Sequence, residues 1–227
     1  MNRLMMGVVS GFAVLAGSAM GDTIEMEYEG VAGGDSAATV KVADEGTFRA
    51  GHMIHTFTSG SRSGESFNTF CIDVREFARA GATTYEIIDL ADAPQPGTPY
   101  GQAKADAVSA VVANAISLGW IDRNLQASSE QAGYLGKMGA IQAAIWGALG
   151  YDIRDNSSRT SDSLNFYYDT LLDGSTFDSS LRTRGLRAVV ASNQQDMLYI
   201  VPLPPAAFAG AGLLMVGFGV RQVRRGR

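Results

Sequence analysis

The 227-residue sequence has little of several residue types on which common functional sites depend. Its single cysteine, Cys71, excludes a disulfide within the chain, so any role of this residue is as a free thiol or as a bond to something other than sulfur. Its two histidines, His52 and His55, would point to opposite faces of one strand, which is a poor arrangement for a shared metal ion. We interpret them as surface or rim residues, and we expect no metal and no cofactor.

Positive charge is also scarce, because the formal net charge is −5, and this argues against a nucleic-acid-binding protein. Charged residues make up only 18% of the chain, but apolar residues reach 46%, so the chain can bury a core and is not fully disordered. Its length fits one domain, or two small subdomains that share a core.

Residues 1–21 have the order of features that is typical of a secretory signal peptide. Arg3 supplies the positive start, Leu4–Ala16 is apolar, and small residues follow up to Gly21. A buried N-terminal helix is the alternative. We therefore expect an exported protein whose mature chain begins near Asp22.

The C-terminal residues 201–227 combine a proline motif, an apolar run and a basic tail. The motif is Val201, Pro202, Leu203, Pro204 and Pro205, and the run Ala206–Val220 precedes four arginines that should stay in the cytoplasm. The run is shorter than the roughly 20 residues of a full membrane span, and counting from Tyr199 lengthens it.

These three features resemble the PEP-CTERM anchor of Gram-negative bacteria in its VPLP-type variant, although Leu203 stands where many members have glutamate. The resemblance implies a C-terminal transmembrane helix and an exosortase-type sorting protease as a partner. It also implies that the protein is anchored in the inner membrane before sorting, and then lies at the cell surface or in the extracellular matrix.

The core between these ends, residues 22–200, contains all 23 acidic residues but only thirteen of the 18 basic ones, so its net charge is −10. Residues 22–92 are mainly β by their alternation and turn residues. The predicted strands are Thr23–Tyr28, Ala38–Val42, Thr47–Phe57, Phe67–Val74 and Thr83–Leu90.

Residues 100–175 change to a helical period, and residues 186–200 return to strand. The predicted helices are Gly101–Leu118, a second from Ser128 or Ser129 to about Leu149, and Asp162–Leu172. This order predicts an α+β fold. We expect an antiparallel β-barrel or sandwich subdomain with an inserted helical subdomain, plus an N-terminal signal helix and a C-terminal transmembrane helix.

Two short segments of the core carry the candidate chemistry. They are Phe70-Cys71-Ile72-Asp73 and, later, Ile141-Gln142-Ala143-Ala144-Ile145-Trp146. Together they resemble the thioester domain of bacterial surface adhesins, with Ile141 where many members have threonine. The resemblance implies that the Cys71 sulfur and the Gln142 side-chain carbonyl form an internal thioester and release ammonia.

The local patterns are compatible with this pairing. Gln142 and Trp146 belong to one helical stripe, with Leu135, Met138, Ile145 and Leu149, so Gln142 should point into the core. Burying an unpaired amide costs about 1–3 kcal/mol, and a thioester would remove the NH₂ group. On the strand, Phe70 and Ile72 should face the barrel core, which would turn Cys71 toward the helices.

The expected reaction is a single acylation of an amine rather than enzymatic turnover. The nucleophile is a thiolate, which Asp73 would disfavour by its charge, although Asp73 could also carry a proton or orient an amide. Phe70 and Trp146 would exclude water. An amine would then attack the Gln142 carbonyl and expel Cys71. The chain has only three lysines, which suits the survival of a reactive acyl group.

Three functions follow from these observations. The first is an exported surface or matrix protein that attaches covalently, through a Cys71–Gln142 thioester, to an amine-bearing target. The second is a non-covalent structural or extracellular-matrix protein of the same fold, in which Cys71 and Gln142 only pack. The third is a cysteine hydrolase that pairs Cys71 with His52 or His55.

Overall fold

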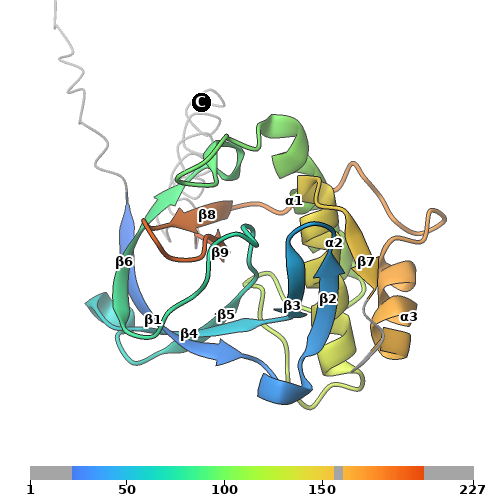
Figure 1. Ribbon diagram of the computed structural model, residues 1–227, viewed down its shortest axis with the longest axis horizontal. Helices are drawn as coiled ribbons and strands as arrows, with labels where there is room; N and C mark the ends of the chain where they lie inside the picture. Colours follow the sequence, from blue (N-terminus) through green and yellow to red (C-terminus); the bar gives the residue numbers. More distant parts are fainter. Residues whose placement is uncertain (1–21, 156–160, 202–227) are drawn as a thin grey trace, which may run out of the picture.

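The computed structural model describes residues 22–155 and 161–201 of the chain. Its fold is α+β, with a nearly closed antiparallel β-barrel on one side and three helices on the other (Figure 1). The six strands of the barrel follow the order β5-β4-β1-β6-β8-β9, and every adjacent pair is antiparallel. Their bounds are β1 (Thr23–Val31), β4 (Met53–Phe57), β5 (Ser66–Thr69), β6 (Ala82–Ile88), β8 (Leu186–Val190) and β9 (Met197–Ile200).

A second, three-stranded antiparallel sheet lies between the barrel and the helices (Figure 1). It has the order β3-β2-β7, with β2 (Ala38–Val42), β3 (Gly46–Ala50) and β7 (Ile153–Asp155). The helices are α1 (Gln102–Ser117), α2 (Tyr134–Leu149) and α3 (Ser161–Leu171), all between β6 and β8 in the chain. Three single-turn 3₁₀ helices, η1 (Gly34–Ser36), η2 (Gly60–Arg62) and η3 (Leu90–Asp92), lie in the connections.

The barrel closes through the segment that follows β5. The N–H of Leu198 donates to the carbonyl of Phe70 at 2.8 Å, and the N–H of Ile72 donates to the carbonyl of Asp196 at 2.9 Å. Cys71 therefore lies directly opposite Met197 in an antiparallel bridge between these two bonds. The chain thus brings Cys71 to the seam at which the two ends of the sheet meet.

Two clusters of buried side chains form the core. The barrel cluster fills the inside of the barrel and continues beneath β2; it includes Met26, Phe57, Phe67, Tyr85, Met197, Val40, Cys71 and Trp146. The helix cluster lies between the helices and the outer side of β8 and β9; it includes Val108, Val112, Leu125, Ile141, Ile145, Leu198, Phe70 and Ile72. Helix α2 contributes side chains to both clusters, so it lies at the boundary between them.

The α+β prediction and the antiparallel barrel are confirmed, while several boundaries differ. The predicted strand Thr47–Phe57 is divided at Gly51, whose φ of 149° and approach to Met138 separate β3 from β4. The predicted strand Phe67–Val74 ends at Thr69, because beyond it only the Cys71 bridge continues the pairing. Helix α2 begins at Tyr134 rather than near Ser128, after a turn at Gly133 with a φ of 73°.

The two ends of the chain are not part of the described structure. The predicted signal peptide, residues 1–21, and the sorting signal from Pro202 to Arg227 lie outside the described residues. Among residues 22–155 and 161–201, no helix is both long enough and apolar enough to span a bilayer.

Candidate functional site

Cys71 and Gln142 are brought together at the barrel seam. The two bonds that close the barrel use the main chain of Phe70 and Ile72, so the N–H and C=O of Cys71 point the other way. The side-chain amide of Gln142 meets both of these groups. The N–H of Cys71 donates to Gln142 Oε1 at 2.9 Å, and Gln142 Nε2 donates to the carbonyl of Cys71 at 2.7 Å. The amide of Gln142 thus takes the place of a neighbouring strand.

These two hydrogen bonds satisfy the buried amide of Gln142 without a covalent bond. Gln142 is 1% exposed, as its place on the helix predicted, but its amide is paired rather than orphaned. The two hydrogen bonds offset the desolvation of the amide, so its burial needs no thioester to explain it. The burial of Gln142 therefore does not by itself distinguish a thioester from a free amide.

Helix α2 is buried almost all round, which is why a single stripe does not describe it. Met138, Ile145 and Leu149 belong to the helix cluster, whereas Trp146 belongs to the barrel cluster. A buried helix with side chains on every face carries Gln142 to the boundary between the clusters. The helix ends at Leu149, as predicted, and Gly150 follows it as a left-handed cap with a φ of 95°.

The predicted orientation of the Cys71 segment was inverted. Phe70 and Ile72 belong to the helix cluster, and Cys71 belongs to the barrel cluster with Met197. The reason is that α1 and α2 cover the outer side of the seam, where the large side chains of Phe70 and Ile72 bury more apolar surface. The sulfur of Cys71 consequently lies on the barrel side, next to Trp146.

The thiol of Cys71 is held in its neutral form. It donates a hydrogen bond from Sγ to the main-chain carbonyl of Asp73 at 3.3 Å. Burial raises the pKa of the Cys71 thiol far above its usual range; the indole of Trp146 opposes this effect and the charge of Asp73 adds to it. The resting site therefore contains a thiol rather than a thiolate.

Asp73 is buried, but its carboxylate is turned away from the sulfur's hydrogen bond. Its Oδ1 accepts the N–H of Arg75 at 2.9 Å and the hydroxyl of Tyr151 at 3.2 Å. Its main-chain carbonyl accepts both the thiol of Cys71 and Nε2 of Gln195 at 3.2 Å. The main-chain carbonyl of Asp73, not its carboxylate, is the group that contacts Cys71.

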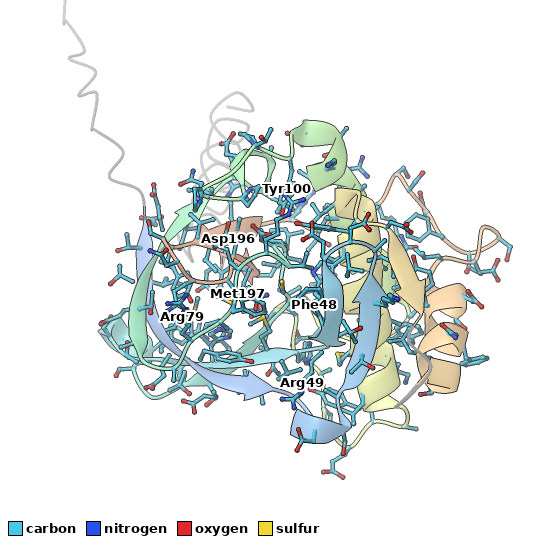
Figure 2. All side chains as sticks on the ribbon, viewed as in Figure 1. Phe48, Arg49, Arg79, Tyr100, Asp196 and Met197 are labelled. Carbon is cyan, nitrogen blue, oxygen red and sulfur yellow. The ribbon has the colours of Figure 1, made fainter. Side chains whose placement is uncertain are left out.

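Sequence reasoning missed three polar residues around this segment: Tyr100, Tyr151 and Gln195. The hydroxyl of Tyr100 donates to the carbonyl of Ile72 at 2.6 Å. Figure 2 labels Tyr100, on the approach to α1, and Met197, on β9. Tyr100 bonds to the residue after Cys71, and Met197 lies opposite Cys71. The only signal in the sequence was that Tyr151 follows the helix stop at Gly150, and nothing separated these tyrosines from ordinary packing residues.

Aromatic rings lead from Cys71 toward the surface. The Trp146 ring meets the edge of Phe48 at 6.1 Å between centroids, and Phe48 lies 6.4 Å from Phe77, which is largely exposed. Trp146 and Phe48 thus pack on the barrel side of Cys71, whereas Phe70 packs on the helix side.

The interpretation of the two histidines as surface or rim residues was wrong, because both side chains are fully buried. Nδ1 of His52 lies 3.0 Å from the hydroxyl of Tyr134, and Nδ1 of His55 lies 3.3 Å from the carbonyl of Met53. Burial lowers the pKa of His52 to about 3 and that of His55 to about 4, so both rings are neutral.

The partners of the histidines do not include Cys71. Their hydrogen bonds and ring contacts among the described residues go to Tyr134, Phe70, Met53, Thr69, Tyr28 and Phe67. No hydrogen bond between Cys71 and either histidine is found among the described residues. No group of three or more His, Cys, Asp or Glu side chains in residues 22–155 and 161–201 could hold a metal ion.

No protein-family model, curated protein or solved structure matches this chain. The chemistry of the site is therefore inferred from its own residues and geometry. These are a neutral buried thiol, a carboxamide held against the residue that carries the thiol, and an aromatic cover.

Proposed function

We propose that this is an exported surface or matrix protein in which Cys71 and Gln142 form an internal thioester for covalent attachment to amine-bearing targets. The observation that carries the proposal is the double hydrogen bond between the Gln142 amide and the main chain of Cys71. It holds the electrophilic carbon of one side chain opposite the residue that bears the nucleophile. Such positioning is the largest part of what an intramolecular reaction needs.

The same contacts favour the chemistry of bond formation. When Sγ attacks Cδ of Gln142, negative charge develops on Oε1, which already accepts the N–H of Cys71. The thiol proton passes to Nε2, and the C–N bond breaks as the C–S bond forms. Ammonia leaves, and the products are one thioester and one ammonia from one thiol and one amide.

The target reaction reverses the roles of sulfur and nitrogen. A primary amine attacks the thioester carbon, its proton passes to sulfur, and the C–S bond breaks. An amide between Gln142 and the target forms, and the Cys71 thiol is restored. Each molecule reacts once, so the proposed protein is not an enzyme. Burial of Cys71 and Gln142 behind Trp146 and Phe48 slows the competing attack by water.

A second candidate is a non-covalent structural or extracellular-matrix protein of the same fold. One observation favours it: every polar group of the Cys71–Gln142 contact is already satisfied without a covalent bond. The amide is paired on both atoms, and the thiol has the Asp73 carbonyl as its acceptor. In this candidate Gln142 serves only to cap the free edge of the barrel seam.

Location follows from the sequence of the two ends. Residues 1–21 would act as a signal peptide whose helix directs export, and residues 201–227 would supply a transmembrane helix. An exosortase-type protease would then read the motif that begins at Val201 and Pro202. The helical part, inserted between β6 and β8, would be carried with the barrel to the cell surface or matrix of a Gram-negative bacterium.

The intact mass of the purified protein tests the proposal, with Cys71→Ala as the matched control. We expect the wild-type mass to lie one ammonia below the mass calculated from its sequence. The Cys71→Ala mass should equal the mass calculated for that variant. Incubation with methylamine should add one methylamine at Gln142 of the wild type only. Peptide mapping of the Gln142 segment locates the adduct.

The structural candidate gives a different result in the same experiment. The wild-type mass would equal the calculated value, and the Cys71 thiol would react with a thiol reagent once the protein is unfolded. Oxygen in place of nitrogen at Gln142 would identify a thioester that formed and later hydrolysed. A full mass with an intact Gln142 amide would therefore overturn covalent attachment.

A further inference from the structure

The segment of Cys71 pairs with β9 along one edge only, and side chains bond the main-chain groups along its other edge. The side chain of Gln142, on α2, makes hydrogen bonds to both the N–H and the C=O of Cys71. The Tyr100 hydroxyl donates to the Ile72 carbonyl at 2.6 Å. The Tyr151 hydroxyl and Gln195 hold Asp73. These four side chains come from the segment before α1, from α2, from the residue after its cap and from the segment before β9. This segment is therefore fixed from several sides by groups that a folded barrel alone does not require.

We propose that Tyr100 and Tyr151 are positioning residues for thioester formation, and that Asp73 anchors Tyr151 rather than acting as a proton carrier. This inference rests on the proposed Cys71–Gln142 thioester. Neither tyrosine would touch the reacting atoms. They would set the direction in which Cys71 presents its sulfur to Gln142.

The contacts around Asp73 support the anchor role. Its Oδ1 accepts two hydrogen bonds, from the Arg75 N–H and the Tyr151 hydroxyl. The thiol proton points to the main-chain carbonyl of the same residue, at 3.3 Å from Sγ. A rotation of Asp73 would therefore move the acceptor of the thiol, and the Tyr151 bond opposes that rotation.

Tyr151 also ties the cysteine segment to the helix that carries the electrophile. It follows the α2 cap at Gly150, so its bond to Asp73 links the end of α2 to the residue two positions after Cys71. Gln142 makes the other link, from the middle of the same helix. Two links between one helix and one segment fix both distance and orientation, whereas one link leaves a pivot.

Both tyrosines stay protonated, and so stay donors, over the whole accessible pH range. Burial raises the pKa of Tyr151 to about 12, and it raises the pKa of Tyr100 further. Each therefore donates to a carbonyl or a carboxylate oxygen, as the geometry shows, and neither serves as a base.

The test compares Tyr151→Phe and Tyr100→Phe with Tyr134→Phe in the full chain. Tyr134 is a matched control because its hydroxyl also makes a part-buried hydrogen bond, to His52 at 3.0 Å, away from Asp73. Cell-free synthesis followed by intact mass spectrometry gives the rate of ammonia loss. We expect Tyr151→Phe and Tyr100→Phe to be roughly five- to tenfold slower than wild type, the effect of one lost positioning bond. Tyr134→Phe should react at the wild-type rate.

Asp73→Asn separates an anchor from a proton carrier. The asparagine carbonyl can still accept both hydrogen bonds of Oδ1, but its amide cannot accept a proton. We expect Asp73→Asn to lose ammonia at a rate close to that of wild type. Thermal unfolding of every variant checks that a slow rate is not a loss of fold, since all three Tyr→Phe variants should lose similar stability.

Each result decides the inference. A wild-type rate in both Tyr151→Phe and Tyr100→Phe would overturn the positioning role, and complete loss in Asp73→Asn would make the carboxylate a proton carrier instead. If the wild type itself never loses ammonia, the proposed thioester fails and this inference fails with it. That outcome is distinct, because it shows in the wild type before any variant is compared.

Discussion

The contact between Cys71 and Gln142 is compatible with two roles for the Gln142 amide, a structural one and a chemical one. Gln142 offers a carbonyl and an NH₂ group at the spacing of a peptide edge, so it pairs with the main chain of Cys71 as a strand would. The same placement holds the amide carbon next to the residue that bears the thiol. Local chemistry thus supports both candidates, and only the covalent state of the two side chains separates them.

Asp196 is the other residue near the seam whose chemistry is unusual. It is fully buried, and its Oδ2 accepts the N–H of Gln95 at 2.8 Å, while Oδ1 has no hydrogen-bond partner among the described residues. Burial, together with the charges of Glu76 and Asp73, raises the pKa of Asp196 to about 7 against the opposing effect of the Gln95 N–H. The folded protein thus holds a proton on Asp196 that the unfolded chain releases near pH 4.

Asp196→Asn should change the pH dependence of stability. In the wild type the contribution of Asp196 is fully present below about pH 4 and is lost as pH rises through about 7, because the unfolded state ionises first. Asparagine does not ionise, so the free energy of unfolding of the wild type should fall relative to the variant by on the order of 2–4 kcal/mol. Urea unfolding of both proteins at pH 4 and pH 8 measures this change.

The buried histidines do not affect the difference in stability between wild type and Asp196→Asn. Their lowered pKa values make the protein less stable as pH falls from about 6.5 toward 4, but both proteins contain them, so their effect cancels in the difference. Parallel stability curves for wild type and Asp196→Asn would show that Asp196 titrates normally in the fold.

At the scale of elements, α2 depends on one glycine for its approach to the small sheet. A Cβ built on Gly139 would lie 2.5 Å from the Cβ of Ala38 on β2 and 3.1 Å from Leu164 on α3. Gly147, on the same helix, would place its Cβ no closer than 3.5 Å to another residue. The absence of a side chain at Gly139 therefore allows the close contact that also carries Gln142 to the seam.

Gly139→Ala should destabilise the protein by about 1–3 kcal/mol, because the added methyl group forces α2 away from β2. Gly147→Ala is the control on the same helix. It should leave stability unchanged or raise it by up to about 1 kcal/mol, because alanine is the better helix former. Chemical unfolding of the two variants gives both values, and equal effects at the two positions would contradict a specific contact at Gly139.

Element types could be predicted well from the sequence, and element ends could not. The helical period gave α1 within one residue at each end, and Gly150 marked the end of α2. The start of α2 was misplaced because Ser128 and Glu130 form a cap-like hydrogen bond within a turn, and Gly133 then begins the helix. The three-residue strand β7 carried no periodic signal, and its pairing with β2 exists only in the fold.

At the scale of the whole molecule, the seam joins the barrel, the helices and the site. The pairing of Phe70 and Ile72 with Asp196 and Leu198 closes the barrel, and α2 covers its outer side. Cys71 lies where these parts meet, so the state of the site depends on the closure of the fold. The acidic core, with its net charge of −10, would favour a cationic amine among targets of equal reactivity.

Truncation after Val201 tests the predicted anchor. The truncated chain should leave the membrane fraction of a Gram-negative host, because it lacks the apolar run and the arginines that would hold it there. It should unfold at the same temperature as the full chain, because the described barrel ends with β9 and the bond from Val201 N–H to Gly185. Cell fractionation and a thermal melt measure the two effects, and a truncated chain that stays with the membrane would contradict the anchor.

The sequence by itself determined the fold class, the main elements and the pair Cys71 and Gln142. Periodicity and turn residues are local properties, and two short motifs carried the pair. Only the tertiary structure decided which way Cys71 faces, that the histidines are buried and that Tyr100 and Tyr151 reach the segment of Cys71. Alternation along a strand gives two faces but does not say which one the helices cover. That choice depends on contacts between residues far apart in the chain, which no local pattern records.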